Sequence, residues 1–140
     1  MKKIMTKKLI FIISLAVSLS GCSSSDRELT PEYTQASGDY KEIAECLNYN
    51  AQNDLSQDPG VITIASMHSP PQARVAEEMR GAASMLIWSA IFVPLPDNKT
   101  AIEFRAFNSL FGGAAGWWNR VEPTLRKCAP TIQPLRKGKF

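Results

Sequence analysis

The chain has 140 residues, of which 44% are apolar and 21% charged, with three cysteines, one histidine and a formal net charge of +3. This composition is ordinary for one small globular domain, and it excludes collagen-like, coiled-coil and wholly disordered chains. The longest apolar run, Leu9 to Leu19, is too short to cross a bilayer as a helix, so the composition also excludes a polytopic membrane protein.

The first 22 residues have the layout of an export signal. Four lysines precede the apolar run, and Leu19-Ser20-Gly21-Cys22 follows it. A basic start, an apolar stretch and small residues before a cleavage point are typical of signal peptides that are removed from the mature protein. We therefore expect residues 1–21 to be cleaved. A non-lipidated signal or a short anchor is the alternative.

Leu19-Ser20-Gly21-Cys22 resembles the lipobox of bacterial lipoproteins. The resemblance implies that Cys22 carries a thioether-linked diacylglycerol and, after cleavage, an acylated amino group. Several acyl chains hold a protein on a bilayer without a transmembrane helix. In enterobacterial lipoproteins an aspartate after the cysteine marks retention in the inner membrane, whereas this chain has Ser23. The resemblance thus implies an anchor in the outer membrane facing the periplasm, or on the outer face of the plasma membrane in a host without an outer membrane.

Removal of residues 1–21 changes the charge balance. The remaining 119 residues hold 12 Lys+Arg and 13 Asp+Glu, so their net charge is about −1. The basic character of the whole chain belongs to the signal peptide and does not indicate nucleic-acid binding. We expect the lipid bilayer as a partner through acylated Cys22, an envelope protein as a candidate second partner, no nucleic acid and no cofactor.

The mature chain is expected to begin with a tether and a helix. Residues 22–38 are polar, rich in Ser, Thr, Pro and Gly, and without apolar periodicity, which predicts a flexible tether. Asp39 begins a capping-box pattern, and apolar residues then recur at helical spacing, which predicts a helix from about Tyr40 to Leu55. Asp58-Pro59-Gly60 ends this helix, and the β-branched run Val61–Met67 predicts a strand.

The segment Ser69–Arg80 fits two structures. Ser69 as N-cap, Pro70 at the first helical position and Gly81 after the end all favour a helix. The alternation of Ala73, Val75 and Met79 favours a second strand. Both alternatives stay open from the sequence.

Two later segments predict a β-hairpin. Met85–Val93 is a nearly continuous apolar run, as expected of a central strand buried on both faces. Thr100–Phe107 alternates apolar with charged residues, which predicts a strand with one buried and one solvent-exposed face. Asp97-Asn98-Lys99 between them is a turn pattern.

A last helix is predicted by a stripe of residues at steps of four and three: Leu110, Ala114, Trp117, Val121, Leu125 and Cys128. Pro123 interrupts the pattern without changing its phase, so we expect one kinked helix. Residues 131–140 are expected to form a basic, frayed tail.

The cysteines predict one disulfide bond. With Cys22 assigned to lipid, Cys46 on the first expected helix and Cys128 on the last are the remaining pair. An exported chain meets an oxidising compartment, in which such a pair forms a disulfide. Two buried thiols that never meet are the alternative.

These elements predict an α+β domain over residues 39–130. We expect an antiparallel sheet of three or four strands, with the N- and C-terminal helices packed on one face and joined by the disulfide. The element order, the lipobox, Cys46 and Cys128 together resemble small uncharacterised envelope lipoproteins of Gram-negative bacteria. That resemblance implies no particular activity.

Few side chains point to catalysis or metal binding. His68 lies between Ser66 and Ser69, but no nucleophile-elbow pattern surrounds it, so we expect a solvated histidine and no catalytic site. Glu77 and Glu78 are candidate ligands for a divalent ion. Adjacent residues rarely share a ligand direction, however, so we expect a solvated face and no metal site.

The tryptophans separate into core and candidate surface. Trp88 and Trp117 are expected in the core. Trp118 lies at the border of the helical stripe near Phe111, and this pair is the expected contact surface. The sequence therefore favours a non-enzymatic binding or accessory protein of the envelope. An immunity or inhibitor protein against a periplasmic toxin is the first alternative, and a small hydrolase is the second.

We expect the substitution Cys22→Ser to block lipidation and to leave an unprocessed precursor, because the thiol is the acceptor that the lipobox pattern implies. Metabolic labelling with palmitate measures this directly. Label that persists in the Cys22→Ser protein would contradict the lipid anchor.

Overall fold

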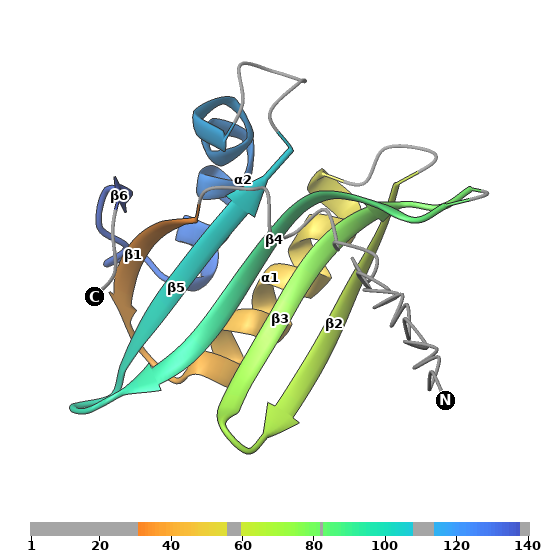
Figure 1. Ribbon diagram of the computed structural model, residues 1–140. Coiled ribbons are helices and arrows are strands. Elements are labelled where there is room, and N and C mark those ends of the chain that lie inside the picture. Colours follow the sequence, from red (N-terminus) through yellow and green to blue (C-terminus); the bar gives the residue numbers. More distant parts are fainter. Residues whose placement is uncertain (1–30, 56–59, 82, 108–113, 138–140) are drawn as a thin grey trace, which may run out of the picture.

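Six strands and two helices make up the described part of the chain. The computed structural model describes residues 31–55, 60–81, 83–107 and 114–137. The elements follow in the order β1 (Glu32–Ser37), α1 (Tyr40–Asp54), β2 (Gly60–His68), β3 (Pro71–Met79), β4 (Met85–Leu95), β5 (Lys99–Ala106), α2 (Ala114–Cys128) and β6 (Arg136–Lys137). All strands belong to one antiparallel sheet in the order β2-β3-β4-β5-β1-β6 (Figure 1). The α+β class is confirmed, but the sheet has more strands than the three or four expected.

Two strands lie where the sequence predicted a tether and a frayed tail. Residues Glu32–Ser37 were expected in the tether, yet they form β1 and pair with β5, with Tyr33 opposite Glu103. Arg136–Lys137, expected in the tail, form β6 on the other side of β1. The domain therefore extends beyond residues 39–130 at both ends. Pairing satisfies the backbone groups of these polar segments, and this gain does not depend on an apolar pattern in their sequence.

The ambiguous segment after residue 69 is a strand. β3 pairs with β2 along its whole length and with β4 on its other side. The local helix signals are overridden because hydrogen bonds on both sides and burial of Ala73 and Val75 outweigh a modest propensity. The β4–β5 hairpin is confirmed, with Asp97 and Asn98 at φ of 64° and 52° in its turn. Asp and Asn tolerate this left-handed conformation better than most residues.

Both expected helices are present. The Asp39 side chain caps α1 by accepting hydrogen bonds from the backbone N–H groups of Lys41 at 2.9 Å and Glu42 at 3.1 Å. The described part of the last helix, α2, begins at Ala114 and continues through Pro123, whose ring is exposed. The expected start of this helix at Leu110 lies outside the described residues.

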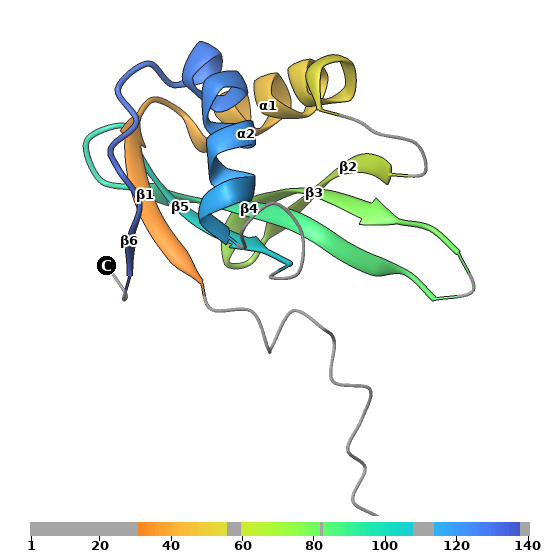
Figure 2. The same ribbon diagram turned by 90° about the horizontal axis from the view of Figure 1, so that it is seen from above.

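The helices and the sheet form two layers. Both helices lie on the same side of the sheet (Figure 2). The core between the layers contains aromatic side chains from the central strands and from α2. The ring of Phe104 stacks on Trp88 with centroids 6.3 Å apart and meets Trp118 edge-on at 5.2 Å. Aliphatic residues of the helices, including Leu47 and Leu125, complete this core.

A disulfide joins the two helices. Cys46 of α1 and Cys128 at the end of α2 are bonded, with their Cα atoms 5.7 Å apart, which confirms the predicted pair. Asn50 lies one turn after Cys46, and its Nδ2 donates to the carbonyl oxygen of Cys46 at 2.9 Å. Lys127 and Asp54 form an exposed ion pair at 2.9 Å between the same helices. The link thus fixes α1 against α2 at the side of the helix layer.

Replacing Cys46 and Cys128 together by alanine should lower the free energy of unfolding by up to about 4.5 kcal/mol, because the bond closes a loop of 82 residues. Urea unfolding followed by tryptophan fluorescence measures the loss. As a control, Lys127→Ala removes only the exposed ion pair and should cost less than about 1 kcal/mol. A double variant that unfolds at the same urea concentration as the native chain would contradict this role.

Candidate functional site

The prediction that Trp118 is part of an exposed contact surface is wrong. Its side chain is only 6% exposed and packs edge-on against Phe104. Trp117 is buried as well, and the guanidinium of Arg120 lies 5.2 Å from the centre of its ring. The face that α2 turns to the sheet is therefore wide enough to bury two adjacent tryptophans. Phe111, the other half of the expected surface, lies outside the described residues, as does Cys22.

His68 lies at the end of β2 in an exposed position. Ser66 and Ser69 are exposed beside it. No hydrogen bond or ion pair between described residues joins His68 to a carboxylate. Within the described residues, His68 is therefore not part of the Ser-His-Asp arrangement that the sequence allows one to draw.

Glu77 and Glu78 point to opposite sides of the sheet. Glu77 faces the helices, is 1% exposed, and accepts a hydrogen bond of 2.7 Å from the indole Nε1 of Trp88. Glu78 lies on the other side and forms an ion pair with Arg74 at 3.5 Å. The two carboxylates cannot share one cation. Among the described residues no group of three His, Cys, Asp or Glu is placed to hold a metal ion.

A β-bulge sets the partner of the buried carboxylate. Glu77 pairs with Trp88 whereas Glu78 pairs with Leu86, so Ile87 is an extra residue on β4. Such a bulge redirects the side chains around it. Ile87 and Trp88 both pack in the core under the helices, while Leu86 packs with Ala76 in a separate small cluster. Sequence periodicity missed Glu77 as a core residue, although its alternation with Ala73 and Val75 was visible.

The side of the sheet opposite the helices is its open face, because neither described helix covers it (Figures 1 and 2). The strand registers place one residue from each strand in a row across this face. In sheet order the row is Ala65, Arg74, Ile91, Glu103, Tyr33 and Arg136. The adjacent row contains Thr63, Ala76, Ser89 and Arg105, of which Ala76 and Ser89 are buried. The open face thus carries arginine, carboxylate and phenol groups.

Charges of both signs are paired across the open face. Arg105 Nε donates to Glu103 Oε1 at 2.7 Å, and Arg74 pairs with Glu78. Partial burial raises the pKa of Tyr33, and the nearby negative charge of Glu103 raises it further, against an opposing effect of Arg105. A side-chain hydrogen bond, which the Tyr33 hydroxyl donates to Glu103, contributes to the same rise of the pKa.

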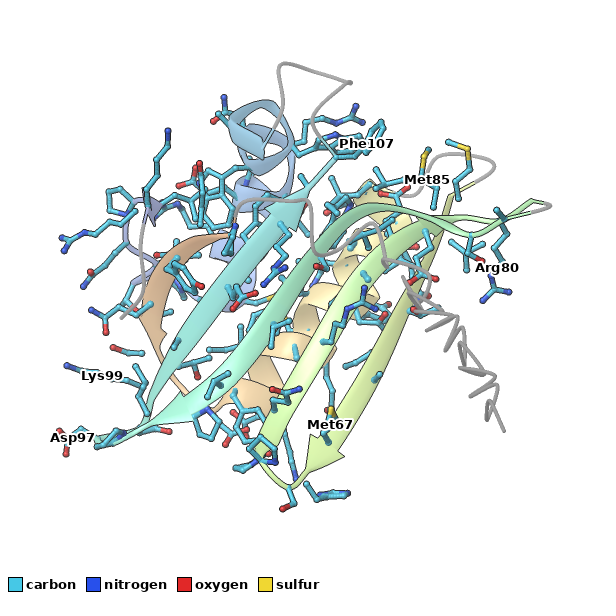
Figure 3. The ribbon with its side chains drawn as sticks, in the orientation of Figure 1. Met67, Arg80, Met85, Asp97, Lys99 and Phe107 are labelled. Atoms are coloured by element: carbon cyan, nitrogen blue, oxygen red, sulfur yellow. A yellow bond between two sulfur atoms is a disulfide. The ribbon has the colours of Figure 1, made fainter. Side chains whose placement is uncertain are left out.

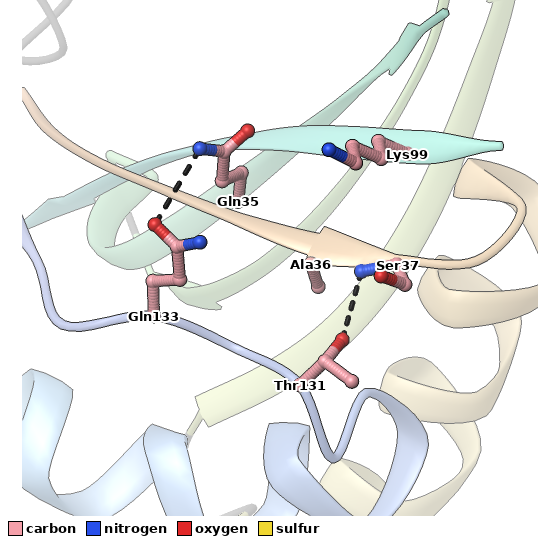
Figure 4. Close-up of a pocket in the computed structure, with 6 residues that line it drawn as sticks. All are labelled: Gln35, Ala36, Ser37, Lys99, Thr131 and Gln133. Atoms are coloured by element: carbon pink, nitrogen blue, oxygen red, sulfur yellow. Dashed lines mark hydrogen bonds between the residues drawn. The ribbon is translucent and has the colours of Figure 1, made fainter. Parts of the chain in front are cut away.

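A small polar recess lies at the end of β1, beside the start of β5 (Figure 4). Its volume is about 160 Å³, and its lining consists of Gln35, Ala36, Ser37, Lys99, Thr131 and Gln133. The backbone N–H of Ser37 donates to Thr131 Oγ1 at 2.8 Å, and Gln35 Nε2 donates to Gln133 Oε1 at 3.4 Å. Lys99 is the only charged residue in the lining. The recess can receive a small polar or anionic group.

The comparisons with known proteins leave the function to be argued from the structure. No known protein family matches the chain, and no match is found among curated proteins. Within the described ranges, no helix is both long and apolar enough to span a bilayer. A fold by itself does not specify an activity, so the function has to be inferred from the residues of the open face.

The substitution Trp118→Ala should lower the free energy of unfolding by about 3–5 kcal/mol, because it opens a cavity beside Phe104. Thermal or urea unfolding measures the change. Tyr49→Ala is the matched control, since Tyr49 is 70% exposed and its loss should change stability by less than about 0.5 kcal/mol. Unchanged stability of Trp118→Ala would mean that Trp118 is not part of the core.

Proposed function

We propose that this protein is an exported lipoprotein whose domain, held at a membrane by acylated Cys22, binds another envelope protein through the open face. The observation that carries the proposal is the row of residues that crosses the sheet on the side away from the helices, in which β3, β5, β1 and β6 contribute arginine, glutamate, tyrosine and arginine side chains. A non-enzymatic binding or accessory role is the function that this surface supports best.

The anchor is supported by Leu19-Ser20-Gly21-Cys22 and by the disulfide. A structural bond between Cys46 and Cys128 suits a protein that matures in an oxidising compartment. Glu32, the first residue of β1, comes ten residues after Cys22 in the sequence, and even fully extended this length of chain reaches only about 35 Å. The domain would therefore stay close to the bilayer surface, with the β1–β6 edge nearest the anchor.

The open face has the composition of a protein-binding surface. Tyrosine and arginine are enriched at interfaces, where they combine apolar contact with hydrogen bonding. Tyr33, Arg74 and Arg105 supply these groups, and Val93, which is 36% exposed, adds apolar area. The side chains stand on paired strands instead of loops, so little ordering is needed when a partner binds.

Charges of both signs favour a partner with a complementary pattern. The pairs Arg74–Glu78 and Glu103–Arg105 are partly exposed, which allows each arginine to exchange its carboxylate for one on a partner. Such complementarity contributes mainly to specificity and to the rate of association. The recess beside Lys99 provides one further polar contact at the border of the face.

A photo-crosslinking amino acid at position 93 of the full chain should capture the partner in cells, because Val93 is exposed on the open face. The same group at position 49 is the control, since Tyr49 is exposed on the helix side. Adducts that form only from position 93, resolved by electrophoresis and identified by mass spectrometry, are the expected result. Equal adducts from both positions, or adducts from position 49 alone, would contradict binding through this face.

The identity of the captured protein separates the two binding functions. A resident envelope protein supports the accessory role. A single toxin held at position 93 would instead identify the protein as an immunity protein, the alternative that the sequence leaves open.

A further inference from the structure

β2 is the outer strand of the sheet, opposite the edge formed by β6. Its nine residues, Gly60–His68, pair with β3 on one side (Figure 1). Of the other described strands, none pairs with its second side. Every second residue of such a strand directs its N–H and C=O groups outward, and these groups form a template for a further strand.

The usual protections against strand addition are missing from β2. Natural edge strands carry charged side chains, proline or bulges, or they are very short. The sequence of β2 contains no Lys, Arg, Asp, Glu or Pro. Its register with β3 runs from Gly60 opposite Met79 to His68 opposite Pro71 without a shift. By contrast, β6 at the other edge has only two residues, and both are basic.

The second half of β2 is open to solvent. Ala65, Ser66, Met67 and His68 are all exposed. Met67 lies close to the β2–β3 turn, at the same end of the sheet as Asp97 and Lys99 (Figure 3). Its side chain is 49% exposed, which is a large apolar area on a strand that is paired on one side only. A strand added along β2 would cover this side chain.

We propose that β2 pairs antiparallel with β2 of a second copy of this chain, about a two-fold axis near Ile64, so that one sheet continues through both copies. Because this pairing uses the edge of the sheet, it is independent of the partner proposed for the open face.

The side chains of β2 favour a second copy as the occupant. A two-fold interface requires that the strand be complementary to itself. With the axis near Ile64, Val61 of each copy lies opposite Met67 of the other, and Thr63 lies opposite Ala65. Since β2 has no charged residue, no like charges meet across the pair. The apolar pair of Val61 and Met67 would contribute at both ends of the interface.

The first test measures the mass of the full chain, purified from membranes in detergent, by sedimentation equilibrium over a range of protein concentrations. We expect a monomer–dimer equilibrium. Ala65→Lys should raise the dissociation constant by about tenfold or more, because it brings two ammonium groups close to the two-fold axis. Val93→Lys is the matched control. It adds the same charge to the open face, but on β4, which is paired on both sides, and it should leave the dimer unchanged.

Amide hydrogen exchange provides the second readout. As protein concentration rises, exchange of alternate β2 amides should slow in the native chain and in Val93→Lys, but not in Ala65→Lys. Urea unfolding of each variant shows whether it is still folded, so a misfolded Ala65→Lys is recognised. In that case Ser66→Lys, at an exposed neighbouring position on β2, replaces it.

Three results would overturn the proposal. The first is a monomer at every concentration with unprotected β2 amides. The second is protection of these amides in a monomer, which would mean that another segment of the chain covers the edge. The third is a dimer weakened by Val93→Lys and not by Ala65→Lys, which would place the interface on the open face.

Discussion

The covalent link between α1 and α2 is the constraint on which the arrangement depends. Cys46 and Cys128 hold the first and last helices side by side on one face of the sheet. Both helices then press their apolar residues onto the same strands, where Trp88, Phe104 and Trp118 fill the space between the layers. Because the two helices share one side, the opposite side receives no helical cover within the described chain. The open face thus goes together with the placement of both helices on one side of the sheet.

Because the helices cover only one side of the sheet, its two sides carry different kinds of side chain. Alternate residues of each strand enter either the core or the open face, so neighbouring residues in the sequence meet opposite surroundings. Glu77 and Glu78 show this most clearly, since one is buried against the Trp88 indole and the other pairs with Arg74 on the far side. The bulge at Ile87 allows this placement, because without an extra residue on β4 the indole would not lie opposite Glu77.

The two proposed interactions use different parts of the sheet. The chain enters at β1, next to β6, so the tether from Cys22 would hold this side of the domain near the bilayer. β2 lies at the opposite edge, four strands from β1, which corresponds to roughly 19 Å at ordinary strand spacing. A second copy could therefore join at β2 without competing with the anchor. The open face between the two edges would stay available to the proposed partner in both the monomer and the proposed dimer.

Local signals in the sequence determined α1 with its Asp39 cap, the β4–β5 hairpin with its Asp97-Asn98 turn, and the pairing of the two cysteines. The first two depend on residues close in sequence, and the cysteine pairing follows from the sequence once Cys22 is set aside for lipid. Tertiary structure alone decided that Glu32–Ser37 is a strand, that the segment after residue 69 is β3, and that Trp118 is buried. The open face could not be predicted from the sequence either, because its rows of residues form only when the six strands pair in one register. The physical reason is the same in each case: hydrogen bonds and burial supplied by distant segments outweigh the weak preferences of the local chain.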